Sequence, residues 1–293
     1  MMRKEAAAGQ FYEASKKELT EHIDELFKLK GKIAAQKIKG SAVQKIKARA
    51  AKNVIGLIVP HAGYAYSGKA AASGYQMLKG MEIDTFIVIG VNHSGFESSV
   101  SLEDFETPLG IAENDNEFSE ELSEIISKNE FPHKYEHSIE VQLPFLQYLF
   151  RTIKIVPVLI GHENYEKCLE IADAIAKISK KQGKKVFIIA SSDFTHYGQG
   201  YGFMPFTGTD EEVKKKMYDL DKKAISFIEK MHGKEFFEFS NKTTICGRIP
   251  ITIAIETCKL MKAKARLINY YTSGDVVKDY RNAVGYAAIS FEK

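Results

Sequence analysis

Several histidines and one cysteine stand at positions in the sequence where a metal ion could be bound. His61, in VPHAGYAYSG, and His93, in GVNHSG, each follow an apolar run and are flanked by glycines, which permit tight turns. Either one alone could be a hydrogen-bonded histidine at a strand end. Because both occupy the same position after what we predict to be adjacent strands, and neutral imidazole is the commonest metal ligand, we expect them to share one metal ion. His162 also follows an apolar run, but its neighbours HENYEK are typical of an ordinary loop and helix start.

Cys246, in TTICGRIP, is the third candidate ligand. Pro250 predicts a helix start just after it, and a helix N-terminus favours a thiolate. With Arg248 nearby, we predict a lowered pKa for Cys246 and expect it to be the reactive thiol. Cys168 and Cys258 fall inside predicted helices and are expected to be buried as small hydrophobic residues. Cys246 does not belong to a two-cysteine metal motif, so its spacing alone is a weak metal signal.

Two further stretches carry groups that could act on a proton. In SSDFTHYG, Asp193 could orient a ligand histidine, and His196 could be a general acid or base. The same stretch is compatible with a helix capped by Ser192 or Asp193. His137 and Glu140, in YEHSIEVQLPFL, are equally compatible with a pocket role and with a structural role.

The elements that must position these residues follow from the apolar runs. Continuous β-branched runs are typical of strands buried on both faces of a parallel sheet. Four such runs end in the polar stretches: 55–60, 85–90, 153–160 and 186–190. Helical patterns occupy the sequence between and after them: 67–79, 119–128, 140–150 and 165–180. Strands that alternate with helices predict βαβ units, whose parallel strands all end at one edge of the sheet, where ligands bind.

The C-terminal part adds a helix over residues 211–231, another after Cys246, and strands over 265–271 and 283–291. No Pro-, Gly- or Ser-rich linker divides the chain. We therefore predict a single domain over residues 1–293, with an α/β fold and a helix-covered, mostly parallel or mixed sheet.

Composition excludes several classes of partner. The 41 Lys and Arg nearly balance the 38 Asp and Glu, and a net charge of +3 argues against nucleic acid or a membrane surface. The sequence has no membrane-length apolar run and no signal-peptide pattern, so a cytoplasmic location is expected. Three cysteines do not make a disulfide framework. The Lys- and Ala-rich segment 28–52 is either a solvated basic face or a docking surface for an acidic partner.

The ordered set of motifs AAAGQFY, VPHAGYAYSG, GVNHSG, EHSIEVQLPFLQ, SSDFTHYG and TTICGRIP resembles the Memo protein family over most of the chain. Prokaryotic members are known as component B of the AmmeMemoRadiSam system. That resemblance implies a radical-SAM protein and an AMMECR-type protein as partners. The family is similar in fold to class III extradiol ring-cleaving dioxygenases. Glu13 and Val91 depart from the family pattern, which often has Pro at both positions, but neither is a proposed ligand.

The resemblance also implies a site. In the dioxygenases two histidines and one carboxylate hold Fe(II). His61 and His93 match the histidines, and Cys246 takes the place of the carboxylate. Three further residues match the acid/base histidine and other pocket positions: His196, His137 and Asp193. The metal would be Fe, Cu or Zn, with thiolate favouring Cu(I) or Zn. Without the carboxylate, we do not expect efficient catechol ring cleavage.

Three functions are compatible with such a site. The first is a metal-dependent redox or oxygen-using enzyme. The second is a zinc hydrolase in which His196 or Asp193 activates water. The third is a non-enzymatic binding or adaptor module whose pocket captures a small molecule or peptide, since an animal relative is regarded as a signalling adaptor.

Overall fold

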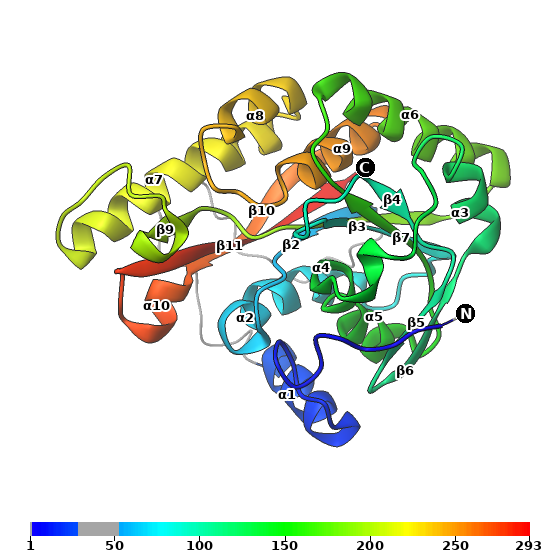
Figure 1. Ribbon diagram of the computed structural model, residues 1–293, viewed down its shortest axis with the longest axis horizontal. Coiled ribbons are helices and arrows are strands. Elements are labelled where there is room, and N and C mark those ends of the chain that lie inside the picture. Colours follow the sequence, from blue (N-terminus) through cyan, green and yellow to red (C-terminus); the bar gives the residue numbers. More distant parts are fainter. Residues whose placement is uncertain (1, 29–52) are drawn as a thin grey trace.

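A computed structural model describes residues 2–28 and 53–293. It has a central sheet with helices on both faces (Figure 1). The predicted basic segment, residues 28–52, lies outside the described residues except for Lys28. No described helix has the length and apolar character needed to cross a membrane.

The sheet is mixed, with a parallel centre and an antiparallel side. Its main path runs β1-β5-β6-β7-β3-β8-β2-β11-β10, with β4 paired to β7 and β9 paired to β11. Strands β6, β7, β3, β8 and β2 are mutually parallel, whereas β11 runs antiparallel to β2, and β10 pairs antiparallel with β11. The strands are β1 (Met2–Arg3), β2 (Val54–Val59), β3 (Thr85–Val91), β4 (Ser99–Val100), β5 (Asp104–Thr107), β6 (Gly110–Asn114), β7 (Lys154–Ile160), β8 (Val186–Ser191), β9 (His196–Gly198), β10 (Lys264–Thr272) and β11 (Asn282–Glu292).

Two apolar cores, one on each face of the sheet, explain why the central strands are hydrophobic throughout. In β2, Ile58 faces one core, and Leu57 and Val59 face the other. Helices α3, α6, α7, α8 and α9 cover the first face, and α1, α2, α4 and α5 cover the second. The helices are α1 (Lys16–Lys28), α2 (Tyr64–Tyr75), α3 (Asn116–Leu122), α4 (His137–Glu140), α5 (Leu143–Phe150), α6 (Tyr165–Gln182), α7 (Asp210–Glu229), α8 (Gly233–Ser240), α9 (Arg248–Leu260) and α10 (Ser273–Val277). Short 3₁₀ turns cover residues 76–78, 132–134 and 199–201.

The predicted α/β class is confirmed, and each predicted strand is present with its ends shifted by at most one residue. The helix predicted over 140–150 is divided into α4 and α5, because Pro144 begins a new first turn instead of continuing the old one. The prediction that the strands before His61 and His93 are adjacent in the sheet is wrong. Strand β8 lies between β2 and β3, so the end of β8 is inserted between the two histidine loops.

Candidate metal centre

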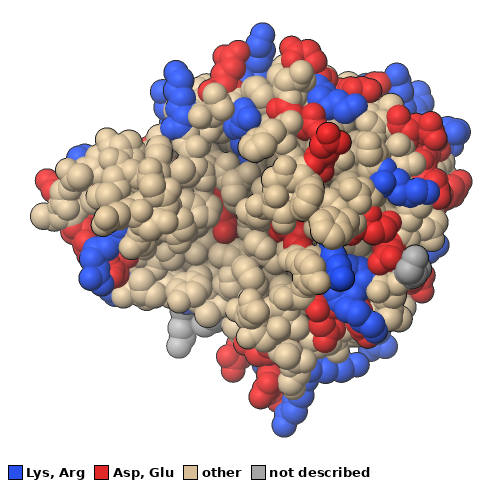
Figure 2. All heavy atoms as spheres, in the orientation of Figure 1, with Lys and Arg blue, Asp and Glu red and all other residues tan. Residues whose placement is uncertain are grey.

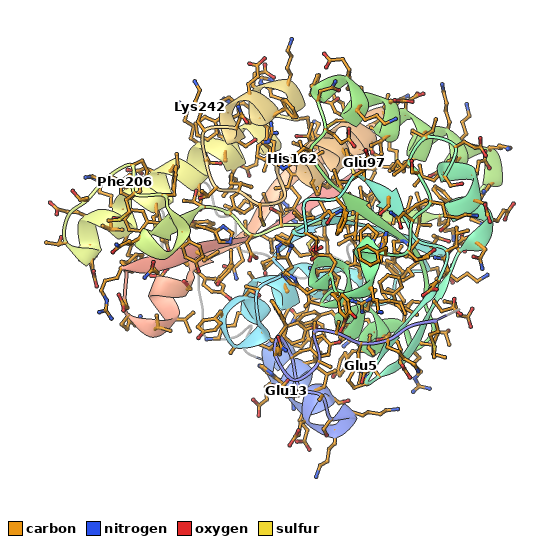
Figure 3. All side chains as sticks on the ribbon, in the orientation of Figure 1. Glu5, Glu13, Glu97, His162, Phe206 and Lys242 are labelled. Carbon is orange, nitrogen blue, oxygen red and sulfur yellow. The ribbon has the colours of Figure 1, made fainter. Side chains whose placement is uncertain are left out.

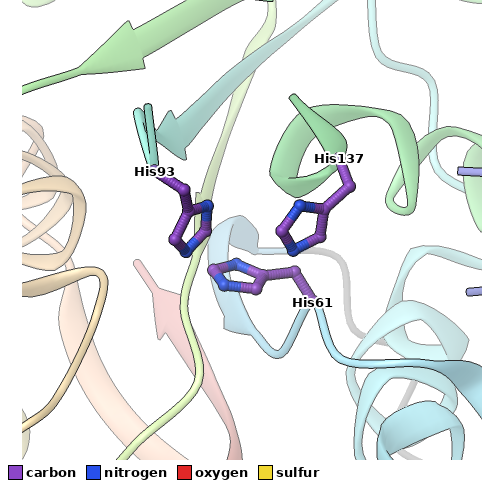
Figure 4. Close-up of side chains that lie close together, drawn as sticks. All are labelled: His61, His93 and His137. Atoms are coloured by element: carbon purple, nitrogen blue, oxygen red, sulfur yellow. The ribbon is translucent and has the colours of Figure 1, made fainter. Parts of the chain in front are cut away.

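Three histidines converge at the carboxyl edge of the parallel strands. His61 follows β2, His93 follows β3, and His137 is the first residue of α4. Their ligand nitrogens all lie within 4.8 Å of one another. Figure 4 shows the three imidazole rings around one space, with centroid separations of 4.9 to 5.4 Å. The His61 side chain is buried, whereas that of His93 is 38% exposed, so the group opens to solvent on the His93 side.

Glu136 fixes the orientation of His93. Its carboxylate caps α4 by accepting from the Ser138 N–H (2.8 Å), and it accepts from the His93 backbone N–H (2.9 Å) and Nδ1 (3.0 Å). Its Oε1 also lies 3.2 Å from His137 Nδ1. Burial alone would raise the pKa of Glu136, but the bond to His93 and the neighbouring imidazoles lower it to about 2. A carboxylate of this kind only accepts, so His93 carries its proton on Nδ1 and presents a free Nε2.

Ser191, at the end of β8, fixes the orientation of the His61 ring in a similar way. Its hydroxyl donates to the Ser138 carbonyl (2.6 Å) and accepts from Gln142 Nε2 (2.8 Å). Since a hydroxyl has one hydrogen, His61 Nδ1, 3.0 Å from the same oxygen, must be the donor. The lone pair of His61 is therefore on Nε2.

Both histidines on the buried side of the group are in the neutral form that binds metals. Burial, reinforced by the neighbouring histidines, lowers the pKa of His61 well below its ordinary value. Burial is also the main reason that the pKa of His137 falls to about 4. Neither imidazole has to lose a proton before it can act as a ligand at neutral pH.

Cys246 lies beside the histidine group but is not a member of it. Its Sγ is 3.2 Å from His61 Nε2 and accepts from the Asp193 N–H at 3.3 Å. This approach requires glycine at position 247, because a Cβ there would lie 2.3 Å from the Cβ of Ser192. We predicted that His61, His93 and Cys246 converge. In the structure His61 and His93 lie together with His137, and Cys246 contacts this group through His61.

The predicted lowering of the Cys246 pKa is wrong. Burial, and then the charge of Asp193, raise it above its ordinary value. The guanidinium of Arg248 lies over the Phe237 ring, 4.3 Å from its centroid, so it does not support a thiolate at Cys246. Burial raises the pKa of Cys168 to about 12 and that of Cys258 further. Cys246 differs from the other two in being only partly buried.

Asp193 lies in the loop after β8, and His196 is the first residue of β9. Asp193 Oδ1 accepts from the backbone N–H groups of His61 (2.9 Å) and Ala62 (3.3 Å), so it holds the main chain of His61 and not its ring. The alternative of a capped helix is wrong, because β9 follows instead. His196 Nδ1 is 2.9 Å from the Thr244 carbonyl, which can only accept, so Nδ1 carries a proton and is the donor. His162, labelled in Figure 3, follows β7 and is not a member of the histidine group.

The N-terminal segment supplies a wall of the site that the sequence analysis missed. Phe11 stacks on His137 with ring centroids 4.2 Å apart, and its carbonyl accepts from the Tyr64 N–H at 2.8 Å. The motif AAAGQFY marked this segment as characteristic, but no local pattern connected it with His137.

Glu140 ties the N-terminal segment to α4. Its buried carboxylate pairs with Arg3 and accepts from Tyr12 and from the backbone N–H groups of Ala6 and Ala7 (2.9 Å each). Arg3 also donates to the carbonyl groups at 133 and 136. Glu140 therefore has a structural role, while His137, one helical turn away, faces the site.

Fold and site together define an α/β protein with a histidine cluster, able to hold a metal, at the carboxyl edge of its parallel strands. The family model described as "Memo-like protein" matches residues 3–290. The chain belongs to the Memo-like protein family.

Similar proteins cover most or nearly all of the chain. A MEMO1 family protein of Methanosarcina barkeri is 38% identical over 296 residues, covering 99% of this chain and 100% of the relative. One from Methanococcus vannielii is 42% identical, covering 81% of this chain and 84% of the relative. Among solved structures, an uncharacterized protein from Escherichia coli K12 has a TM-score of 0.49 and 12% identity, covering 80% of this chain and 98% of that one.

Proposed function

We propose that this protein is a metal-dependent redox or oxygen-using enzyme, with the metal held by His61, His93 and His137. The observation that carries the proposal is the convergence of three imidazoles whose ligand nitrogens lie within 4.8 Å of one another. Glu136 and Ser191 hold the Nδ1 atoms of His93 and His61, so the Nε2 lone pairs are available without rearrangement.

The donor set fits a first-row transition metal. Imidazole suits Fe, Cu and Zn, and a neighbouring thiol shifts the preference toward Cu(I) and Zn. Two ligands of one tetrahedral ion, one nitrogen and one sulfur, lie about 3.5 Å apart when the metal bonds are about 2.0 and 2.3 Å. The 3.2 Å between His61 Nε2 and Cys246 Sγ is close to that value, so Cys246 is the candidate for a fourth ligand or for a replacement of His137.

The metal, when bound, would supply Lewis acidity and, if it is Fe or Cu, a change of oxidation state. The chain's own residues do the rest. Asp193 holds the main chain of His61, and His196 can accept or return a proton at Nε2. The exposed side of His93 is where a substrate would enter.

Metal analysis and titration test the proposal. Protein purified without oxygen is analysed for Fe, Cu and Zn, then stripped and titrated with each ion. We expect one ion per chain, and strong loss of affinity in H61A, H93A and H137A but not in the control H232A, which removes a surface histidine paired with Glu235. X-ray absorption separates a three-nitrogen site from one containing sulfur, with C246S as the comparison. Absence of stoichiometric binding of any of the three ions would refute the proposal.

Assays for oxygen consumption and for hydrolysis, carried out on the metal-bound protein, distinguish a redox enzyme from a zinc hydrolase. Ligand binding that survives removal of the metal would instead favour a non-enzymatic binding or adaptor module. We still expect no efficient catechol cleavage, which an aerobic assay of the Fe(II)-loaded protein checks.

We also propose, from family membership alone, that the protein works beside a radical-SAM protein and an AMMECR-type protein. Co-purification from the native cell is the test.

A further inference from the structure

We propose that Gln142, itself held by Tyr75, is a positioning residue that fixes both the main chain and the ring of His61. The inference rests on the proposed function only in treating His61 as a metal ligand. The fixation of the ring can also be measured in the metal-free protein, so the two ideas can fail separately.

Gln142 connects the α4–α5 segment to the strand ends around His61. It lies between α4 and α5, and its side chain is fully buried. Its Nε2 donates to the Pro60 carbonyl at 3.0 Å and to the Ser191 hydroxyl at 2.8 Å. Pro60 directly precedes His61, and the Ser191 hydroxyl accepts from His61 Nδ1 at 3.0 Å. One amide group therefore holds the main chain of the His61 loop and, through Ser191, the ring.

Pro60 and Tyr75 fix the orientation of this amide. A carbonyl can only accept, so the Gln142 atom beside the Pro60 carbonyl is the NH₂ group, and Oε1 is the atom left for Tyr75. Oε1 accepts from the Tyr75 hydroxyl at 2.8 Å. Burial raises the pKa of Tyr75 well above its ordinary value, so the hydroxyl keeps the proton that it donates. The Tyr75 ring stacks on Phe145 with centroids 5.1 Å apart, and this stacking fixes the position of the hydroxyl.

The chain of bonds from Tyr75 through Gln142 to Ser191 lies away from water. The three side chains are fully buried. Figure 2 shows Lys, Arg, Asp and Glu side chains at the surface, whereas these three linked groups are neutral. A buried amide is stable only when its polar groups are bonded, because water cannot replace a lost partner. An apolar residue would fill the same space without that requirement, so what Gln142 adds at this position is its set of hydrogen bonds.

The place of Gln142 in the chain also brings all three histidines under the control of one short segment. This segment begins with Glu136, which orients His93. Its second residue, His137, is itself a member of the histidine group. It ends with Gln142, which acts on His61 through Ser138's neighbour in space, the hydroxyl at the end of β8. The segment therefore positions the whole group.

Two buried glutamines allow a matched test in the full-length protein. Gln142→Met removes the amide and keeps a side chain of similar length. Gln147→Met is the control, because Gln147 on α5 is also buried but bonds to Thr107 and to the Gly110 carbonyl, in β5 and β6. We expect similar losses of stability in both variants. Zn²⁺ affinity, measured by competition with a chelator, should fall about 10-fold to 100-fold in Gln142→Met only, the usual effect of removing a group that orients a ligand.

The His61 ring gives a second readout that needs no metal. In the metal-free protein its Nδ1–H signal, assigned by its loss in H61A, should exchange with solvent about tenfold faster in Gln142→Met than in the wild type. Such an increase is expected when hydrogen bonds that oppose local opening are lost. Unchanged exchange, Zn²⁺ affinity within about twofold of the wild type, or equal effects in Gln147→Met would each overturn the proposal.

If Gln142→Met does not fold, Tyr75→Phe decides, because it leaves the glutamine in place and removes only the bond to Oε1. We expect about a 2-fold to 10-fold loss of Zn²⁺ affinity, as for one neutral hydrogen bond. Tyr64→Phe is the matched control, since Tyr64 is also a buried tyrosine of α2 and its hydroxyl donates to the Val141 carbonyl at 2.7 Å. No change in Tyr75→Phe, or an equal loss in Tyr64→Phe, would overturn the proposal. If the wild type binds no metal, the proposed function fails, and exchange of the His61 Nδ1–H still decides the role of Gln142.

Discussion

Replacing Glu136 by Gln should weaken metal binding without displacing a single ligand. The carboxylate accepts from two nitrogens of His93 and from the Ser138 N–H, at 2.8 to 3.0 Å. Gln keeps one acceptor oxygen and turns the other atom into a donor, so at least one of these contacts becomes a clash of donors. A hydrogen bond to a charged group contributes about 1.5–3 kcal/mol, which corresponds to about a 10-fold to 100-fold loss of metal affinity. That range matches the usual effect of removing the partner of a ligand histidine.

The assay is competition with a chelator of known affinity, for Zn²⁺ in air and Fe(II) without oxygen. Glu235→Gln is the matched control, since it removes a carboxylate 3.6 Å from a surface histidine, His232. In the metal-free protein, nitrogen NMR of His93 should show less of the form protonated on Nδ1. A folded Glu136→Gln variant that binds metal within about twofold of wild type, outside the usual range for such partners, would refute the reasoning.

Three further predictions concern the groups that support the site. Glu140→Gln breaks a buried charge pair with Arg3 and should cost about 3–5 kcal/mol in the free energy of unfolding, measured by denaturant titration. Burial raises the pKa of Asp221 to about 6, so the folded state holds this proton more tightly than the unfolded state. Stability is therefore lost as pH rises from about 4 to 6, and the wild type should lose up to about 3 kcal/mol relative to Asp221→Asn. Phe11→Leu removes the ring stacked on His137, and metal affinity should fall about 2-fold to 10-fold in the chelator assay.

Each of these has a control and a contradicting result. Glu124→Gln, Asp219→Asn and Phe131→Leu change exposed residues of the same types and should be neutral. A loss below about 1 kcal/mol for Glu140→Gln would mean that Arg3 finds another partner. If the stability difference between Asp221→Asn and the wild type does not change with pH, burial does not raise the pKa of Asp221. Unchanged metal binding in Phe11→Leu would show that the N-terminal segment does not contribute to metal binding at the site.

The fold could be predicted from the sequence because its central strands are apolar on both faces and are followed directly by small and polar residues. The run before His61 and the run before His93 each place a histidine at a strand end, and parallel strands bring those ends to one edge. Strand order was not readable. No local pattern shows that β8 lies between β2 and β3, so the role of Ser191, at the end of β8, could not be predicted.

The parts of the site that were not predicted depend on contacts distant in sequence or on side-chain direction. His137 was expected in the pocket but not as a third member of the histidine group. It is placed there by α4, which Glu140 fixes to the N-terminal segment more than 130 residues away. Glu136 had a visible signal, an acidic residue directly before a histidine, but its bond to His93 required the docked helix. Arg248 is two residues from Cys246 in sequence, yet its guanidinium packs on an aromatic ring, so sequence proximity misjudged the pKa.

Under the proposed function, metal binding and the fold would stabilise one another. Each histidine of the group comes from a different element, and each is oriented by a separate group: His61 by Ser191, His93 by Glu136, and His137 by the stacked Phe11. The unfolded chain cannot bring the three together, so any metal affinity is expressed only by the folded state and adds to its stability. The Glu140 contacts that hold the N-terminal segment against α4 would thus be part of the same equilibrium, although none of them faces the histidine group. Loss of the segment would therefore weaken metal binding, and loss of metal would loosen the segment.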